Sequence, residues 1–186
     1  MARRRTIATR WRPGRSWRRL ASDVGGAAVV EFALVISMLS IALLNTVDVA
    51  RYYYARSEVE NATQMGTQSA WKTCDTTKLP ATTNCPGFQT AVSTGVQSTS
   101  LGTAVALQTG SPSEGFYCVA TSGALTRVSG VSSKPADCSS VGSASDQPAD
   151  YVQVQTSYAY HPIFTGLSIG SLMPSTITST SMMRMQ

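Results

Sequence analysis

The chain has 186 residues, enough for one ordinary domain and an appendage, and only 13% of them are charged. So low a charged fraction, together with abundant Thr, Ser and Gly, is typical of an exported, β-rich surface and argues against a cytoplasmic enzyme. The net charge of +5 is unevenly distributed, because residues 1–26 hold eight arginines and one acid, whereas the remainder holds seven basic and nine acidic residues. The basicity therefore belongs to one short segment and not to a folded surface.

Three roles compete for this basic segment. Its arginines, with Trp11 and Trp17, could bind phosphates and stack on bases. An Arg-rich, acid-poor stretch could also be an organelle transit peptide. A basic flank could instead fix the orientation of a membrane helix. Because an apolar run follows, we favour the third role and expect no nucleic-acid partner.

The apolar run is long enough to cross a bilayer. Ala27–Val47 is 21 residues with one charge, about 31 Å of helix, close to the hydrocarbon thickness of a membrane. A cleaved secretory signal would need small residues at −3 and −1, but cleavage after Ala50 or Ala55 would place Asp48 or Tyr53 at −3. The sequence predicts a retained anchor with its basic end in the cytoplasm and its C-terminus outside.

The helical pattern continues beyond the apolar run to about Trp71. Apolar or small residues recur there every three or four positions, namely Tyr52, Ala55, Val59, Ala62, Gly66 and Ala70. One interpretation is a simple membrane stalk. The sharper interpretation is a helix whose small-residue face packs in an array of helices.

Glu31 lies inside the apolar run, where an ionisable group costs about 3 kcal/mol or more unless it finds a partner. Cleavage between Gly26 and Ala27 would create a positive amino terminus at the same depth. Glu31 would then be the fifth residue, about one turn from its own terminus, and it could pair with the terminus of a neighbouring helix. The acid would in that case set an assembly register.

The segment "GGAAVVEFALV" resembles the processing site of type IV pilin-like proteins: a basic leader, a glycine, a glutamate five residues later, and then an aromatic and aliphatic run. With "VDVARYYYARSEVENATQMGTQSAW", it resembles the TadE/TadG-like minor pseudopilins of tight-adherence (Flp) pilus systems. Asp48 stands for the acid that this family places before Arg51. "GFYCVATSGALTRV" and "DYVQVQTSYAYHPIF" are similar to the family's C-terminal strands.

The resemblance implies a minor pseudopilin that assembles through its N-terminal helix in pilus biogenesis, adhesion and secretion. It implies a prepilin peptidase cut between Gly26 and Ala27, and a role for Glu31 and Phe32 in helix register. The implied partners are that peptidase, other pilin and pseudopilin subunits, the inner-membrane assembly platform and membrane lipid. The implied location is the bacterial inner membrane, with a single pass, a cytoplasmic N-terminus and a periplasmic C-terminal domain, or an extracellular pilus. The alternative is an uncleaved, membrane-anchored periplasmic scaffold of the pilus machinery.

The exported part is expected to complete an α+β fold, a long N-terminal helix followed by a small antiparallel β-sheet with disulfides. "DYVQVQTSYAY" and "TITSTSMMRM" predict strands, "TAVALQT" and "GFYCVAT" predict a hairpin around "GSPSEG", and "PGFQTAVSTGVQST" predicts a short helix that buries Phe88, Val92 and Val96. The expected divisions are a leader at 1–26, a membrane span at 27–47, a helical continuation at 48–71 and a periplasmic domain at 72–186.

The cysteines Cys74, Cys85, Cys118 and Cys138 all lie beyond the predicted span. An even number in a small exported domain predicts two disulfides, for which three pairings are possible. Proximity in the chain favours Cys74–Cys85 and Cys118–Cys138. No Cys-x-x-Cys pair and only one histidine are present, so no zinc site is expected.

No catalytic motif emerges from the sequence. His161 is the lone histidine, no Gly-x-Ser-x-Gly accompanies it, and the exported acids are scattered without a paired-carboxylate spacing. We therefore expect neither an enzyme nor a cofactor. A membrane-anchored hydrolase that uses His161 and a loop serine is the rival hypothesis.

Overall fold

The computed structural model describes residues 24–166 and 168–186, so the predictions for most of the basic leader lie outside the described residues. Residue contacts divide the chain into two units, one that ends at Leu44 and one that comprises Asn45–Gln186. A single helix, α2 (Val24–Thr73), contributes residues to both units. The helix ends two residues beyond the predicted position.

The first half of α2 is an apolar helix without a protein partner among the described residues. Its large side chains from Val29 to Leu43 are exposed, and none of the most apolar 18-residue window is buried. Ser37 and Ser40 donate their hydroxyl hydrogens to the carbonyls of Leu34 and Ile36, so neither hydroxyl needs water. Such a surface suits lipid better than water.

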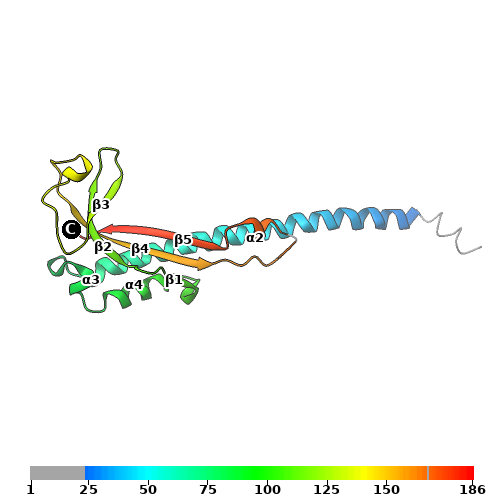
Figure 1. Ribbon diagram of the computed structural model, residues 1–186. Coiled ribbons are helices and arrows are strands. Elements are labelled where there is room, and N and C mark those ends of the chain that lie inside the picture. Colours follow the sequence, from blue (N-terminus) through cyan, green and yellow to red (C-terminus); the bar gives the residue numbers. More distant parts are fainter. Residues whose placement is uncertain (1–23, 167) are drawn as a thin grey trace, which may run out of the picture. The chain divides into compact units, whose positions relative to one another are not determined.

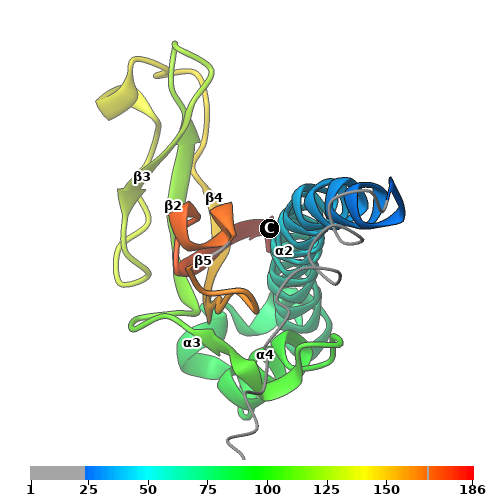
Figure 2. The same cartoon turned by 90° about the vertical axis from the view of Figure 1, so that its right-hand side faces the viewer.

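The sheet is antiparallel throughout. The described residues include five strands: β1 (Val105–Leu107), β2 (Ser113–Val119), β3 (Leu125–Ser129), β4 (Ala149–Ala159) and β5 (Thr176–Arg184). β4 pairs with β5 along one edge and with β1 and β2 along the other, and β3 pairs with β2 (Figures 1 and 2). The long helix followed by a small antiparallel sheet confirms the predicted fold class.

Strand β4 shows the predicted alternation. Val152, Val154 and Thr156 are fully buried, whereas the residues between them are only partly buried. A period of two places one face on the core and the other toward solvent. The predicted C-terminal strand is also present as β5, in which Ile177 is buried.

The hairpin predicted around "GSPSEG" is wrong. β1 does not pair with β2; instead Val105–Leu107 pairs with residues 156–158 of β4, and β2 pairs with residues 149–153. Both short strands therefore lie one after the other along one edge of β4. Between them Ser111 Oγ accepts a 2.8 Å hydrogen bond from Gln155 N, which gives β4 a partner where the turn interrupts the ladder. The observed hairpin is β2–β3, closed by a 2.8 Å bond from Ala120 N to Ala124 O.

The second half of α2 packs into the core of the unit Asn45–Gln186, which is called the sheet unit. Its buried residues include Ala55, Val59, Ala62 and Ala70. At Gly66 an added Cβ would lie 2.6 Å from Val96 Cγ2 and 3.4 Å from Val154 Cγ1. Thr63 Oγ1 and Thr156 Oγ1 are 2.6 Å apart. The small-residue face is thus covered by the chain's own sheet, which corrects both the bare stalk and the helical array as interpretations of this face.

Short helices cover the remaining core. α4 (Phe88–Val96) buries Phe88, Val92 and Val96, as predicted. α3 (Ala81–Asn84) precedes it. The described 3-10 turns are Thr76–Lys78, Gly102–Ala104, Ser139–Val141 and Ile169–Leu172.

Two disulfides fasten the ends of this unit. Cys74–Cys85 links the end of α2 to the residue after α3, and Cys118–Cys138 links β2 to the segment before β4. These are the pairs that chain proximity favours. Each closes a short loop, so each mainly limits the freedom of the unfolded chain.

We expect the double variant Cys118→Ser/Cys138→Ser to lose about 3 kcal/mol of unfolding free energy, because this bridge closes a loop of 20 residues. Urea unfolding of the full chain in detergent, without reductant, measures the loss. Adding dithiothreitol should lower the variant's stability further, because it reduces the remaining disulfide, Cys74–Cys85. An unchanged unfolding midpoint in the double variant would contradict the pairing.

Candidate functional site: the apolar helix and the Asp48 junction

The residues predicted for processing and assembly lie together near the start of α2. Ala27, Glu31 and Phe32 are exposed, and a Cβ added to Gly26 would meet no described atom within 4 Å. Within the described residues no hydrogen bond or ion pair reaches Glu31. The acid is therefore presented on an open apolar helix, where a second chain has access to it.

The junction between the two halves of α2 is organised by Asp48. This residue is fully buried, one position beyond the predicted span. Asp48 Oδ1 accepts a 3.1 Å hydrogen bond from Ile163 N, and Oδ2 accepts a 3.3 Å bond from Phe164 N. The carboxylate thus holds the connection between β4 and β5, of which the structure describes residues 161–166 and 168–173 (the 161–173 loop).

Further contacts fasten the 161–173 loop to the same turn of α2. Asn45 Oδ1 accepts a 2.7 Å bond from Ile169 N, and the Tyr160 hydroxyl donates a 2.9 Å bond to the carbonyl of Asp48. Gly170 allows the loop to approach closely, because a Cβ there would lie 3.0 Å from Asp48 Oδ2. The loop is therefore held by its backbone, independently of its exposed side chains.

The environment of Asp48 favours its ionised form. Burial raises the pKa of the carboxyl, but the hydrogen bonds from Ser168, Ile163 and Phe164 and the positive charge of Arg51 outweigh burial and lower the pKa below its usual value. An ionised Asp48 is the stronger hydrogen-bond acceptor. The junction is consequently held most firmly when Asp48 carries its charge.

A second buried acid lies where β2 meets α3. Glu114 accepts hydrogen bonds from Ala81 N (2.7 Å), Thr82 N (2.7 Å) and Thr82 Oγ1 (2.6 Å). Strand register places it diagonally from Asp150 on β4. These two acids show no paired-carboxylate spacing along the chain, because only the pairing of β2 with β4 brings them together.

Asp150 is nearly buried, and its Oδ1 has no hydrogen-bond partner among the described residues. Burial and the negative charge of Glu114 raise the pKa of Asp150 to about 7, against the opposing effect of Lys134. The fold therefore retains a proton on Asp150 that the unfolded chain would release at a much lower pH. This pair supports the fold and makes its stability depend on pH.

We expect the unfolding free energy to fall as the pH rises from about 4 to about 7, because a raised carboxyl pKa stabilises the fold only while the group is protonated. Asp150→Asn should remove about 2 kcal/mol of this decrease, a value that includes the opposing effect of Lys134. Urea unfolding of both proteins at about pH 5 and about pH 8 measures the difference. Equal pH dependence in the two proteins would contradict the assignment to Asp150.

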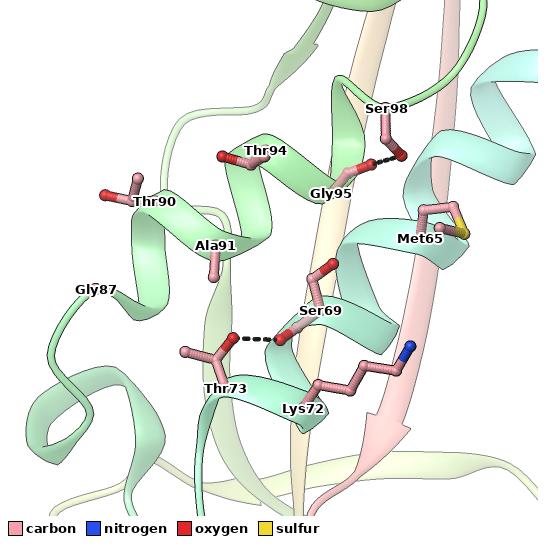
Figure 3. Close-up of a pocket in the computed structure, with 10 residues that line it drawn as sticks. All are labelled: Met65, Ser69, Lys72, Thr73, Gly87, Thr90, Ala91, Thr94, Gly95 and Ser98. Carbon is pink, nitrogen blue, oxygen red and sulfur yellow. Dashed lines mark hydrogen bonds between the residues drawn. The ribbon is translucent and has the colours of Figure 1, made fainter.

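An open groove of about 680 Å³ lies between the end of α2 and α4 (Figure 3). Two of its hydroxyls are engaged locally, since Thr73 Oγ1 donates to Ser69 O at 2.7 Å and Ser98 Oγ donates to Gly95 O at 2.7 Å. The helices approach closely at Gly95, where a Cβ would lie 2.8 Å from the carbonyl oxygen of Met65. The groove is lined by one charged residue, Lys72, and by no acid or histidine.

The hydrolase hypothesis gains no support from the placement of His161. This residue is exposed just after β4, and no described residue forms a hydrogen bond or ion pair with it. The part of the chain that the structure describes also contains no group of three or more His, Cys, Asp or Glu residues placed to hold a metal ion.

Sequence reasoning missed the partners of Asp48. The acid itself was noted before Arg51, but its contacts lie more than a hundred residues away in the chain. Asn45 was also missed, although it is a polar residue near the end of a predominantly apolar span. A search for polar residues at the end of an apolar helix would have selected both.

Comparison with known proteins agrees with the sequence patterns. The family model described as "TadE-like protein" matches residues 26–68, which comprise the apolar half of α2 and most of its packed half. No curated protein and no solved structure gives a significant match. Residues 26–68 are therefore similar to a TadE-like domain.

Proposed function

We propose that the chain is a minor pseudopilin of a tight-adherence pilus. The apolar half of α2 lies in the inner membrane, and the sheet unit lies in the periplasm. A prepilin peptidase removes the basic leader after Gly26, and the new terminus at Ala27 pairs with Glu31 of the same or a neighbouring helix. The chain acts as a substrate of that peptidase and as a building block, together with other pilin subunits and the assembly platform.

The proposal rests on the difference in exposure between the two halves of the TadE-like segment. Its first half exposes large apolar side chains and Glu31, whereas one face of its second half is buried under the sheet. A helix with this division can enter a bundle of membrane helices without unfolding the domain that it carries. The Asp48 junction lies at the boundary between these two roles.

The alternative is an uncleaved periplasmic scaffold that remains in the inner membrane. The same anchored helix and sheet unit serve that role equally well. The two functions differ in the fate of the chain: a pseudopilin enters the filament, and a scaffold stays behind when the filament is removed.

Fractionation of cells that carry a C-terminally tagged chain tests the proposal. Protease added to spheroplasts should degrade the tagged sheet unit and spare the membrane-embedded helix, and some tagged chain should leave the cell with sheared pili. Loss of the gene should abolish pili. A tagged chain that never appears in sheared pili, with the membrane pool intact, would favour the scaffold, and protection of the tag in spheroplasts would contradict both functions.

A further inference from the structure

The 161–173 loop exposes large apolar side chains without a partner in the described structure. Ile163 is 52% exposed, Ile169 is 51% exposed and Leu172 is 84% exposed. Exposed single apolar residues are common on soluble proteins, but three of them within ten residues of one loop point to a partner. The loop also contains no Asp, Glu, Lys or Arg, as is true of the whole stretch 160–183.

The loop lies at the level where α2 leaves the predicted membrane span. Ile169 lines a shallow groove with Asn45, Thr46, Val49 and Ala50 (Figure 1 shows the loop between β4 and β5 beside α2). The span was predicted to end at Val47, between the residues of α2 that line this groove. Residues 45–50 cover about 7.5 Å along a helix axis, which is similar to the headgroup zone on one side of a bilayer.

We propose that the 161–173 loop is a second membrane contact, in which Ile163, Ile169 and Leu172 insert into the headgroup zone of the outer leaflet of the inner membrane. This inference rests on the proposed function, because it requires that α2 spans the membrane. Its exposed side chains would lie at the depth where amphipathic and apolar residues meet the membrane–water interface.

Lipid is the occupant that this position favours. A single span that leaves the bilayer at Val47 is surrounded by headgroups at the level of residues 45–50, so the patch reaches lipid without any further partner. Its lack of formal charge also suits an apolar zone and gives an acidic or basic protein surface nothing to pair with. Backbone hydrogen bonds to Asp48 and Asn45 hold the loop in place and leave its apolar side chains available.

Insertion of the loop would give the sheet unit a fixed orientation on the membrane. A helix alone allows rotation and tilting of the domain that it carries, whereas a second contact removes that freedom. Asp48 is the positioning residue of this contact, because its carboxylate binds the backbone of the loop at Ile163 and Phe164.

A fluorescent reporter of lipid contact tests the inference in the full chain. All described cysteines are in disulfides, so one introduced cysteine can be labelled with an NBD fluorophore under non-reducing conditions. Leu172→Cys tests the loop, Met38→Cys reports on the span, and Val119→Cys, on an exposed residue at the opposite end of the sheet, is the matched solvent control. The proteins are reconstituted in vesicles of phosphatidylethanolamine and phosphatidylglycerol, with and without doxyl-labelled lipid.

We expect the Leu172 label to be blue-shifted and quenched several-fold more than the Val119 label, most strongly by a doxyl group near the headgroup. Adding Asp48→Ala should reduce the quenching at Leu172 and leave that at Met38 unchanged. Quenching at Met38 with a solvent-like signal at Leu172 would overturn the inference and leave the membrane anchor standing. A blue-shifted Leu172 label that lipid does not quench would also overturn it, since protein would then cover the loop. An unquenched Met38 label would refute the anchor itself.

Discussion

Glu31→Ala should remove the chain from assembled pili while the sheet unit stays folded. In the proposed assembly Glu31 neutralises the amino terminus created at Ala27 inside the membrane. Removal of the acid would leave that positive charge unpaired at a cost of about 3 kcal/mol, which corresponds to about a hundredfold loss in an assembly equilibrium. The amount of tagged chain in sheared pili, relative to the membrane pool, measures the effect.

Ser37→Ala provides a matched control for this prediction. Ser37 is an exposed polar residue on the same apolar helix, and its hydroxyl bonds only to Leu34 O in the described structure. Its replacement should leave incorporation unchanged. Glu31 forms no hydrogen bond or ion pair with a described residue, so both variants should unfold in urea like the wild type. Normal incorporation of Glu31→Ala would refute the charge-pairing mechanism and favour the scaffold alternative.

Gly66→Leu should unfold or strongly destabilise the sheet unit. Even the Cβ of an alanine would lie 2.6 Å from Val96 Cγ2, so α2 and α4 would have to separate from the sheet. Overpacking of this kind costs about 1–3 kcal/mol for a small addition, and a leucine adds three further carbons in the same place. Urea unfolding of the full chain in detergent, followed by circular dichroism, measures the loss.

Gln64→Leu introduces the same side chain on an exposed position of the same helix, two residues earlier. It should leave the stability close to that of the wild type. The pair of variants also distinguishes the observed packing from a helical array. If the small-residue face met neighbouring helices instead of the sheet, Gly66→Leu would block assembly and spare the stability of the isolated chain.

Sequence patterns correctly predicted the elements whose hydrophobic periodicity or composition is visible within a single segment. The alternation in β4 and the spacing of Phe88, Val92 and Val96 in α4 each define a buried face without reference to any other part of the chain. The apolar half of α2 follows from composition alone, and the disulfide pairs follow from short separations along the chain.

Features that depend on partners distant in the sequence could not be derived in this way. The spacing from Tyr52 to Ala70 predicts a small-residue face but does not identify what covers it. The hairpin prediction failed because "GSPSEG" is typical of a turn, and nothing in it shows that β1 and β2 both pair with the much longer β4. The contacts of Asp48 with residues 163 and 164 likewise form only after the sheet has brought the 161–173 loop to α2.

The central claim is that the mature chain begins at Ala27, where a new amino terminus meets Glu31. Intact mass and N-terminal sequencing of the protein purified from membranes test it most directly, in cells with and without the prepilin peptidase. We expect a terminus at Ala27 that appears only when the peptidase is present. An arginine-rich terminus retained in both strains would contradict it and leave an uncleaved anchor in the membrane.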